Sequence, residues 1–322
     1  MKLVDVTLRD GGHQLGFAWP LEFVRDYLAI MLDISQIDFI EIGYWKQSGK
    51  FDGRFYSVDE ELLELLAPGD SRKIGIMIDF HYCNKSLDAY PSGEGLAPGL
   101  IRLTSRKEDF ERALDFLGKL KRHTGALTSL NIFNISNYSR LEILRAINLA
   151  ATKPPDFIYF ADTHGSVDLE DRGAEFAEYA RRITDIGSEP GFHLHNHTGK
   201  AFFNYRLLGE LGYTITDGSI NGLGKGLGNL ALEHVVAGGE KIEILELWRQ
   251  YDSLFEMPTS PFGVVTGTFS TADHYADQAV QLGLDIRSFG SFVERLEVSQ
   301  KDNYDRNAML RYLNESTGNG DQ

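Results

Sequence analysis

Short apolar runs rich in β-branched residues alternate along the chain with longer stretches whose apolar positions recur at helical spacing. Because strands have a period of two and helices a period near 3.6, this alternation predicts strand–helix pairs. The expected strands are 2–8, 38–45, 73–80, 100–105, 127–135, 156–165, 191–197 and 214–222. The expected helices are 21–32, 58–67, 107–123, 139–151, 168–185 and 200–211, with another beginning near Asn229.

Eight strands, most of them followed by a helix, favour an α/β fold, a (β/α)8 TIM barrel, over residues 1–238. A doubly wound open sheet is the alternative, and it needs fewer strand–helix units. Residues 239–315 have the pattern of a helical C-terminal extension with a break at 257–263, and the polar stretch 316–322 is typical of a disordered tail.

Composition limits the classes of function. The 322 residues include 47 Asp and Glu against 32 Lys and Arg, giving a formal net charge of −15, which argues against a nucleic-acid-binding protein. The single cysteine, Cys83, excludes an intrachain disulfide and a zinc site built from cysteines. The N-terminal segment meets a charge at Asp5, and no apolar run approaches the roughly 20 residues that span a bilayer. We therefore expect a soluble, cytoplasmic protein.

Polar side chains gather at the ends of the expected strands. In a (β/α)8 barrel the active site lies at the carboxyl ends of the strands, so these residues should converge on one rim. They are Arg9, Asp10 and His13 after the first strand; Glu41 and Tyr44; Asp79 and His81; Asn131 and Asn134; Asp162, Thr163 and His164; and Asp217, Ser219 and Asn221.

The stretch "GFHLHNHTGK" (191–200) carries His193, His195 and His197 at alternating positions. Because strand side chains alternate between faces, His193 and His195 share a face and could offer two imidazoles to one cation. Asp10 could supply an anionic ligand, with Arg9 beside it to stabilise an oxyanion. A pair of hydrogen-bonded histidines lining a pocket is the alternative. His197 is expected at the rim, facing substrate or capping the next helix.

Five stretches together resemble the pyruvate-aldolase branch of the HMG-CoA lyase-like, or DRE-TIM, metallolyase family, which contains 4-hydroxy-2-oxovalerate aldolase. They occur in the family's order and span most of residues 1–233: "TLRDGGH" (7–13), "FIEIGYW" (39–45), "ADTHGSV" (161–167), "GFHLHNHTGKAFFN" (191–204) and "DGSINGLGKGLGNLALE" (217–233).

The resemblance implies one divalent metal ion per subunit, Mn²⁺ or Mg²⁺, held by Asp10, His193 and His195. It implies that Arg9 stabilises the enolate of pyruvate and that His13 is the acid/base group. Asn229 is implied either as a further ligand or as a residue that orders the site. Substrate contacts are expected from Glu41, Tyr44, Thr163, His164, His197 and Lys225. Three of these have open alternatives: Glu41 as an arginine partner, Thr163 as a helix cap and Lys225 as a solvated side chain.

The chain also departs from the family. The loop "GLGKGLGN" lacks the cysteine of the lyase branch, which disfavours an acyl-CoA lyase. Phe269 aligns with a tyrosine of the aldolase. His164 and His197 stand where small, amide or acidic residues are commoner, which indicates an altered substrate pocket.

The resulting hypothesis is a metal-dependent (class II) pyruvate aldolase, a carbon–carbon lyase that cleaves or forms a 4-hydroxy-2-oxo acid. Its partners would be a small 2-oxo acid and an aldehyde. The resemblance also implies a homo-oligomer, with an aldehyde dehydrogenase partner bound through the C-terminal extension. The alternatives are a Claisen-type acyl-CoA condensing enzyme or lyase of the same family, and a barrel without catalytic activity. A dinucleotide site at the glycine-rich loop is disfavoured because no βαβ unit with a following acidic residue lies downstream.

Overall fold

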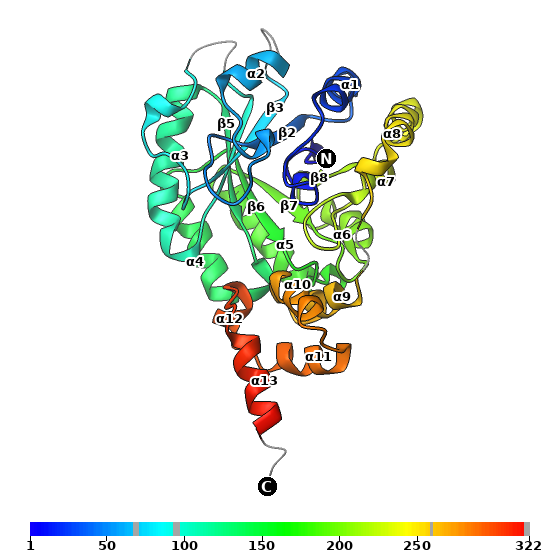
Figure 1. Cartoon of the computed structure of the whole chain (residues 1–322). Helices are drawn as coiled ribbons and strands as arrows, with labels where there is room; N and C mark the ends of the chain where they lie inside the picture. The colour runs from blue at the N-terminus through cyan, green and yellow to red at the C-terminus, as the bar shows by residue number, and fades with distance from the viewer. Residues whose placement is uncertain (67–70, 93–96, 258–259, 319–322) are drawn as a thin grey trace.

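Eight parallel strands close into a barrel in sequence order, with β8 pairing back onto β1 (Figure 1). The computed structural model describes residues 1–66, 71–92, 97–257 and 260–318. The strands are β1 (Lys2–Asp5), β2 (Phe39–Tyr44), β3 (Ile74–Asp79), β4 (Leu100–Thr104), β5 (Leu127–Ile132), β6 (Phe157–Asp162), β7 (Glu189–Leu194) and β8 (Ile215–Gly218). The predicted TIM barrel is confirmed, and closure of the sheet rules out the open-sheet alternative.

Helices cover the outside of the barrel. They are α1 (Leu21–Met31), α2 (Glu60–Leu66), α3 (Phe110–Thr124), α4 (Arg140–Ala150), α5 (Leu169–Asp185), α6 (Ala201–Leu208), α7 (Leu232–Val235) and α8 (Gly238–Gln250). In α3 the apolar residues at helical spacing are the buried ones, and the helix ends at Gly125, whose φ of 74° suits a left-handed cap. Helix α4 begins with a capping box between Ser139 and Glu142.

Several strands end earlier than their apolar pattern predicts, because polar side chains bind the backbone just beyond them. The carboxylate of Asp5 accepts hydrogen bonds from the Thr7 amide at 2.8 Å and the Thr7 hydroxyl at 2.6 Å, which ends β1 before the predicted residue 8. Asp162 likewise accepts from the Ser166 and Val167 amides at 3.0 and 2.9 Å. Short strands leave long loops at the carboxyl rim.

The helix expected near Asn229 begins slightly later, as α7 at Leu232. Asn229 and Ala231 form backbone bridges with His195 and Ser219, so a helix cannot begin at Asn229. The ring of helices is completed by α7 and α8, and α8 contacts α1. The expected domain boundary at 238/239 thus falls at the start of α8, which contributes Ile244 to the barrel core.

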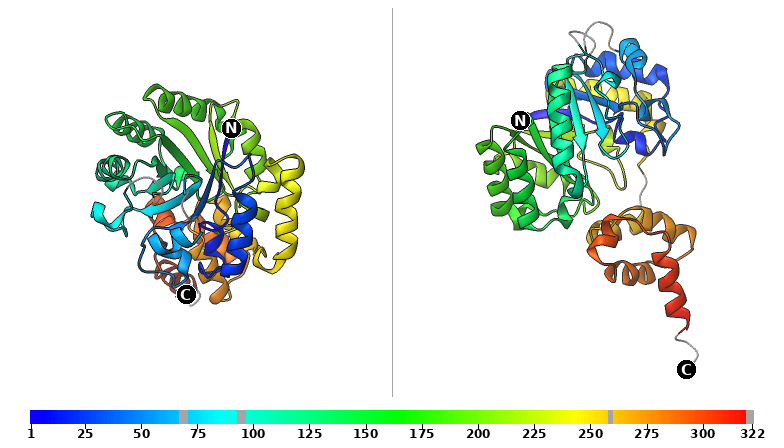
Figure 2. Two further views of the ribbon diagram at one scale, coloured as in Figure 1. Left: turned by 90° about the horizontal axis from the view of Figure 1, so that it is seen from above. Right: turned by 90° about the vertical axis from the view of Figure 1, so that its left-hand side faces the viewer.

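A second apolar core begins after residue 260. It is formed by α9 (Pro261–Thr268), α10 (His274–Gln281), α11 (Ile286–Glu294) and α13 (Ala308–Gly318), and the short helix α12 (Val298–Asp302) lies between α11 and α13 in the chain. Figure 2 shows these orange and red helices gathered at one end of the barrel. Asn137, which follows β5, donates to the Ser270 carbonyl at 3.1 Å and to Asp302 at 2.6 Å, so the extension meets the carboxyl rim.

The predicted disordered tail, 316–322, overlaps the end of α13 at Gly318, and residues 319–322 lie outside the described part. None of the described helices has the length and apolar character needed to cross a membrane.

Candidate active site

Asp10, His193 and His195 meet at the carboxyl rim of the barrel. One ligand-type atom from each side chain lies within 4.8 Å of the other two, and all three residues are buried. His193 belongs to β7, whereas His195 follows the strand and is held by its backbone bridge to Asn229. The structure therefore brings together the three residues that the sequence predicts as metal ligands.

The two histidines turn the same ring nitrogen toward each other. His193 Nδ1 donates to Asp217 Oδ2 at 2.8 Å, and His195 Nδ1 donates to the Gly228 carbonyl at 3.1 Å. Because these partners are acceptors, Nδ1 of each ring carries a proton, and Nε2 is the nitrogen that can bind a cation. The two Nε2 atoms are 3.1 Å apart, and burial together with the neighbouring His193 lowers the pKa of His195 well below its ordinary value. Two facing lone pairs in a buried place fit a shared cation.

Asp10 completes the set with negative charge. It pairs with Arg9, and its Oδ2 accepts from the Lys225 amide at 3.1 Å and from Asn229 Nδ2 at 2.9 Å. Burial opposes ionisation of Asp10, but Arg9 and the nearby histidines hold its pKa well below the ordinary value. Asn229 thus orders Asp10, while its own Oδ1 is buried with no hydrogen-bond partner among the described residues.

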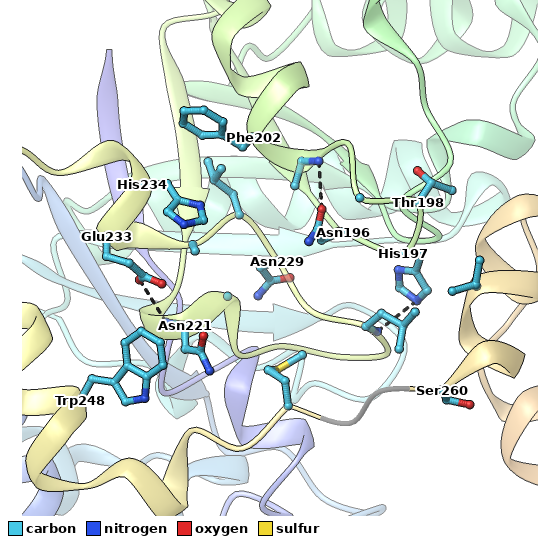
Figure 3. A pocket seen from close by; sticks show the side chains of 18 of the residues that line it. Asn196, His197, Thr198, Phe202, Asn221, Asn229, Glu233, His234, Trp248 and Ser260 are labelled. Carbon is cyan, nitrogen blue, oxygen red and sulfur yellow. Dashed lines mark hydrogen bonds between the residues drawn. The ribbon is translucent and has the colours of Figure 1, made fainter.

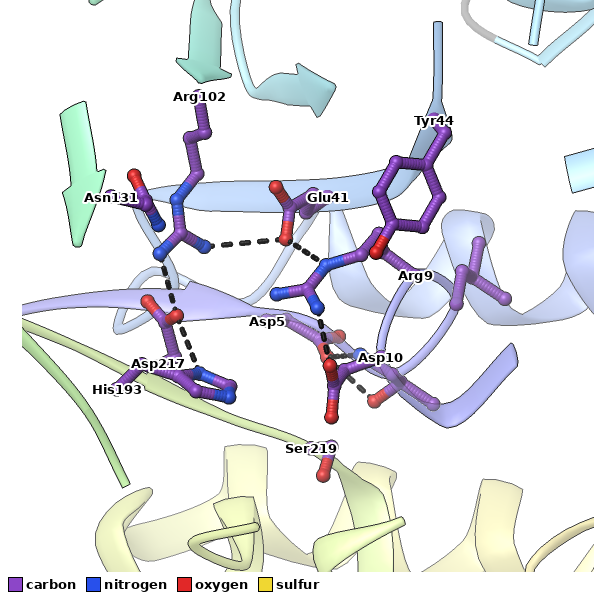
Figure 4. A network of polar contacts seen from close by, with 12 residues as sticks. Asp5, Arg9, Asp10, Glu41, Tyr44, Arg102, Asn131, His193, Asp217 and Ser219 are labelled. Carbon is purple, nitrogen blue, oxygen red and sulfur yellow. Dashed lines mark hydrogen bonds and ion pairs between the residues drawn. The ribbon is translucent and has the colours of Figure 1, made fainter. Parts of the chain in front are cut away.

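A fully buried arginine, Arg102 of β4, connects the two sides of this cluster. It donates to Asp217 Oδ2 at 2.7 Å and to Glu41 Oε2 at 3.2 Å, as Figure 4 shows. The same Glu41 oxygen accepts from Arg9 Nε at 2.7 Å. A continuous chain of polar contacts therefore runs from His193 to Arg9. Glu41 is fully buried between two guanidinium groups, so its described contacts are those of an arginine partner.

Arg102 is absent from the residues singled out in the sequence, although a signal existed. It is the one charged residue in the strand "LIRLT", and a charged side chain in a short apolar strand is rarely buried unless it is paired. Its guanidinium also lies 4.3 Å from the centre of the Tyr159 ring. Asp217 could be predicted as a rim residue, but its contact with His193 depends on neighbouring strands and could not.

His13 lies in a 3₁₀ turn, Gly11–His13, among aromatic rings. The rings of Phe17, Phe51 and Tyr44 have centroids 5.0, 5.8 and 6.3 Å from that of His13, and the Tyr44 hydroxyl is 3.5 Å from His13 Nε2. Burial lowers the pKa of His13 to about 3, which the charge of Asp10 only partly opposes. The imidazole is therefore neutral near pH 7 and able to accept a proton.

His13 faces a cavity of about 250 Å³ between the barrel rim and α10. The predicted Lys225 contributes to its wall, as does Lys50, which no sequence motif pointed to. The cavity is lined by His13, Gln14, Lys50, Phe51, Lys225, Gly226, Asp273, His274 and Asp277.

Two predicted substrate residues face the C-terminal helices instead. His197 Nε2 lies 2.9 Å from Asp273 Oδ1, and His164 Nε2 lies 3.8 Å from Asp302 Oδ1. Both histidines are buried. Their described contacts therefore join the barrel to its extension, and no cation cluster among the described residues includes them.

Thr163 and Phe269 also have structural contacts. The Thr163 hydroxyl accepts from the Asn134 amide at 2.9 Å, which joins the loops after β5 and β6. Phe269 follows α9 and packs into the apolar core of the extension. Neither residue lines the cavity at His13.

A larger cavity of about 1000 Å³ lies beside the glycine-rich loop, between α6, α8 and α9 (Figure 3). Its walls are mainly apolar, with Phe202, Leu230, Trp248 and Met257 among them. Asn229 lines it as well, so this cavity adjoins the cluster around Asp10, but it does not include His13.

Residues 104–251 match the model of the HMGL-like family. The chain carries an HMGL-like domain. This finding agrees with the family resemblance predicted from the motifs, and the matched segment includes both histidines of the cluster and the glycine-rich loop.

Named relatives of this chain are lyases and a synthase. A 4-hydroxy-2-oxovalerate aldolase of Pelotomaculum thermopropionicum is 26% identical over 247 residues, covering 75% of this chain and 70% of the relative. A homocitrate synthase of Pyrococcus abyssi is 29% identical over 243 residues, covering 73% and 64%. The family and these names mark the chain as an enzyme of the lyase type.

Among solved structures, the N-terminal domain of a candidate aldolase from Bacteroides vulgatus superposes with a TM-score of 0.68. It is 19% identical, and the alignment covers 97% of this chain and 99% of that domain. At this identity the likeness establishes the fold.

Proposed function

We propose that the protein is a divalent-metal-dependent pyruvate aldolase, which cleaves or forms a 4-hydroxy-2-oxo acid. The observation that carries the proposal is the cluster of Asp10, His193 and His195, with both Nε2 atoms directed at one another and an arginine and a neutral histidine at the same rim. The likeness to 4-hydroxy-2-oxovalerate aldolase supports this reaction.

The residues of the cluster suit Mn²⁺ or Mg²⁺. The hydrogen bonds of His193 to Asp217 and of His195 to Gly228 orient both rings and keep Nε2 free, as ligating histidines require. Asp10 adds an anionic oxygen, and the unpartnered Asn229 Oδ1 is a further oxygen at the site. A divalent ion bound here would supply Lewis acidity toward the oxygens of a 2-oxo acid.

Arg9 and His13 carry the remaining chemistry. In cleavage, His13 accepts the proton of the C4 hydroxyl, the C3–C4 bond breaks, and the aldehyde carbonyl forms. The electron pair of that bond passes to the pyruvyl fragment as an enolate, which becomes pyruvate on protonation at C3. Arg9, held by Glu41 and Asp10, places positive charge near the growing negative charge. Synthesis follows the same steps in reverse.

The test is an aldehyde panel incubated with pyruvate, Mn²⁺ and either the wild-type protein or His13→Ala, read by pyruvate consumption. Loss of a general base costs about 10²–10⁴-fold in rate, so His13→Ala should show little turnover while keeping wild-type metal content. His123→Ala is the matched control, because it removes a half-buried imidazole in the last turn of α3, outside the site, and should keep wild-type turnover. Wild-type turnover by His13→Ala would disprove the assignment of the base.

A Claisen-type condensation with an acyl-CoA is the second candidate, favoured by the likeness to homocitrate synthase. Consumption of acetyl-CoA with a 2-oxo acid, without turnover of any aldehyde, would support it over the aldolase. We also propose a cytoplasmic homo-oligomer with a dehydrogenase partner at the C-terminal helices. Co-purification of a dehydrogenase with the protein from the native cell tests the proposed partner.

A further inference from the structure

We propose that the aldehyde used by this enzyme carries an anionic group, a carboxylate or a phosphate, which Lys50 and Lys225 bind in the cavity next to His13. The inference rests on the proposed aldolase function and adds the class of its second substrate.

The position and size of the cavity limit what it can hold. His13, the proposed base at the C4 hydroxyl, lines it, so the aldehyde part of the substrate must lie there. Its volume of about 250 Å³ is below the range of about 300–1,000 Å³ typical of drug-sized ligands. Only a short aldehyde fits. Phe51 is the one large apolar side chain of the wall, which disfavours an alkyl aldehyde.

Two lysines line this cavity, the exposed Lys50 and the half-buried Lys225. Lys50 Nζ contacts His274 Nε2 at 2.9 Å, and since an ammonium group only donates, His274 accepts as a neutral ring. Among the described residues, neither Lys50 nor Lys225 forms an ion pair with a carboxylate, whereas Lys46, near Lys50 in the chain, pairs with Glu60 at 2.7 Å. Lys50 and Lys225 are also close enough to repel each other. A bound anion would relieve this repulsion.

The carboxylates of the wall, Asp273 and Asp277, attract the lysines, but among the described residues they form no ion pair with them. Asp273 Oδ1 is occupied by His197 at 2.9 Å and by the Thr266 hydroxyl at 3.0 Å. Asp277, on α10, is attracted to both Lys50 and Lys225 but forms no ion pair with either among the described residues. Its oxygens are available to accept from a hydroxyl group of the substrate. The wall is therefore polarised, with cations on the barrel loops and carboxylates on the extension.

Lys225 is held in place by a tightly fixed loop. Its backbone amide donates to Asp10, and Gln14 Nε2 donates to the Gly224 and Gly226 carbonyls at 2.6 and 3.3 Å. Gly226 has a φ of +62°, and a Cβ there would lie 2.2 Å from His197 Nε2. Only glycine allows the loop to approach His197 this closely. The ammonium group of Lys225 is thus presented from a backbone that also fixes the proposed metal ligand.

A neutral aldehyde would occupy the cavity and leave both cations unpaired. Hydrogen bonds to charged groups contribute about 1.5–3 kcal/mol, which corresponds to roughly 10- to 150-fold in kcat/KM. Sites built to pair a polar group reject analogues that lack it more strongly than they reject a change in chain length. The enzyme should therefore prefer an anionic aldehyde over a neutral aldehyde of similar length.

The experiment compares kcat/KM for three aldehydes with pyruvate and Mn²⁺: succinic semialdehyde for a carboxylate, glyceraldehyde 3-phosphate for a phosphate, and butanal as the uncharged probe. We expect one anionic aldehyde to exceed butanal by at least about tenfold. Lys225→Met and Lys50→Met should each reduce that preference about tenfold, and Lys225→Arg should retain most of it. Lys119→Met, an exposed lysine on α3, is the matched control and should keep the wild-type preference.

Two results would overturn the inference: butanal used as well as both anionic aldehydes, or equal losses for all three aldehydes in the Lys→Met variants. The better of the two anionic probes identifies the anion. A second assay tests the proposed aldolase function separately from the inferred preference for anionic aldehydes. It measures deuterium exchange into the methyl group of pyruvate in D₂O without any aldehyde. If deuterium enters pyruvate but the enzyme does not prefer anionic aldehydes, only the inference about the aldehyde is refuted. If no deuterium enters pyruvate, the proposed aldolase function is refuted.

Discussion

Replacing Asp217 with asparagine should weaken both metal binding and the stability of the fold, because the carboxylate contacts His193 and also pairs with Arg102. Asp217 Oδ2 accepts from His193 Nδ1 at 2.8 Å and from Arg102 at 2.7 Å, and the residue is only 1% exposed. Asparagine keeps an oxygen for one donor but has no charge. Losing a carboxylate behind a ligating histidine weakens metal affinity by about 10–100-fold. Breaking one partner of a buried ion pair costs about 3–5 kcal/mol, and because Glu41 still contacts Arg102, we expect about 3 kcal/mol.

Both effects can be measured on the same protein. Titration with Mn²⁺, followed by electron paramagnetic resonance, gives the dissociation constant, and urea denaturation of the metal-free protein gives the free energy of unfolding. Asp162→Asn is the matched control, since Asp162 is a buried carboxylate on β6, two strands away from Asp217, that binds the Ser166 and Val167 amides. It should lose stability and keep its Mn²⁺ affinity. Wild-type Mn²⁺ affinity in a destabilised Asp217→Asn protein would refute the view that Asp217 orients a metal ligand.

Three further predictions concern the surroundings of the cluster. Arg102→Met leaves the fully buried Glu41 and Asp217 without their shared cation and should lower the free energy of unfolding by about 3–5 kcal/mol in urea; a loss no larger than that of an exposed Lys119→Met would contradict this. Burial holds the pKa of His13 at about 3. Phe51→Ala exposes the ring and should raise that pKa toward the ordinary value of about 6.5. Because cleavage needs the unprotonated ring, kcat/KM at saturating Mn²⁺ should then fall up to about fourfold between pH 7.5 and 6 while the wild type stays flat; parallel profiles would show that burial does not set this pKa. Gly226→Ala should disturb the loop through its contact with His197, lowering kcat/KM for the anionic aldehyde, and unchanged kinetics would mean that the loop can move aside.

The architecture could be predicted from the sequence because each strand–helix pair has its own apolar period. What differed were the strand ends and the start of the helix expected near Asn229, which begins at Leu232. At Asp5 and Asp162, side-chain hydrogen bonds to the following backbone end the strand, and these compete with the sheet in a way that hydropathy does not record. At Asn229 the backbone pairs with His195, a contact between distant segments.

The candidate site could be predicted only in part for a similar reason. Asp10, His193 and His195 follow motifs, and the structure gathers them. The surroundings of His164 and His197 depend on helices more than 70 residues later in the chain, namely the contacts to Asp302 and Asp273, and no local pattern reveals them. Arg102 could be noticed in the sequence as a charged residue inside an apolar strand, but its partners lie on other strands and could not be predicted.

Metal-dependent cleavage is tested by pyruvate release from a 4-hydroxy-2-oxo acid. The protein is first treated with a chelator and then resupplied with Mn²⁺ or Mg²⁺. In the wild type, cleavage should be lost with the chelator and restored by the ion. His195→Gln replaces one of the two facing imidazole nitrogens with a weaker amide ligand, and it should neither bind the ion tightly nor recover activity. Undiminished cleavage in the chelated protein, or full recovery by His195→Gln, would contradict metal-dependent cleavage at this site.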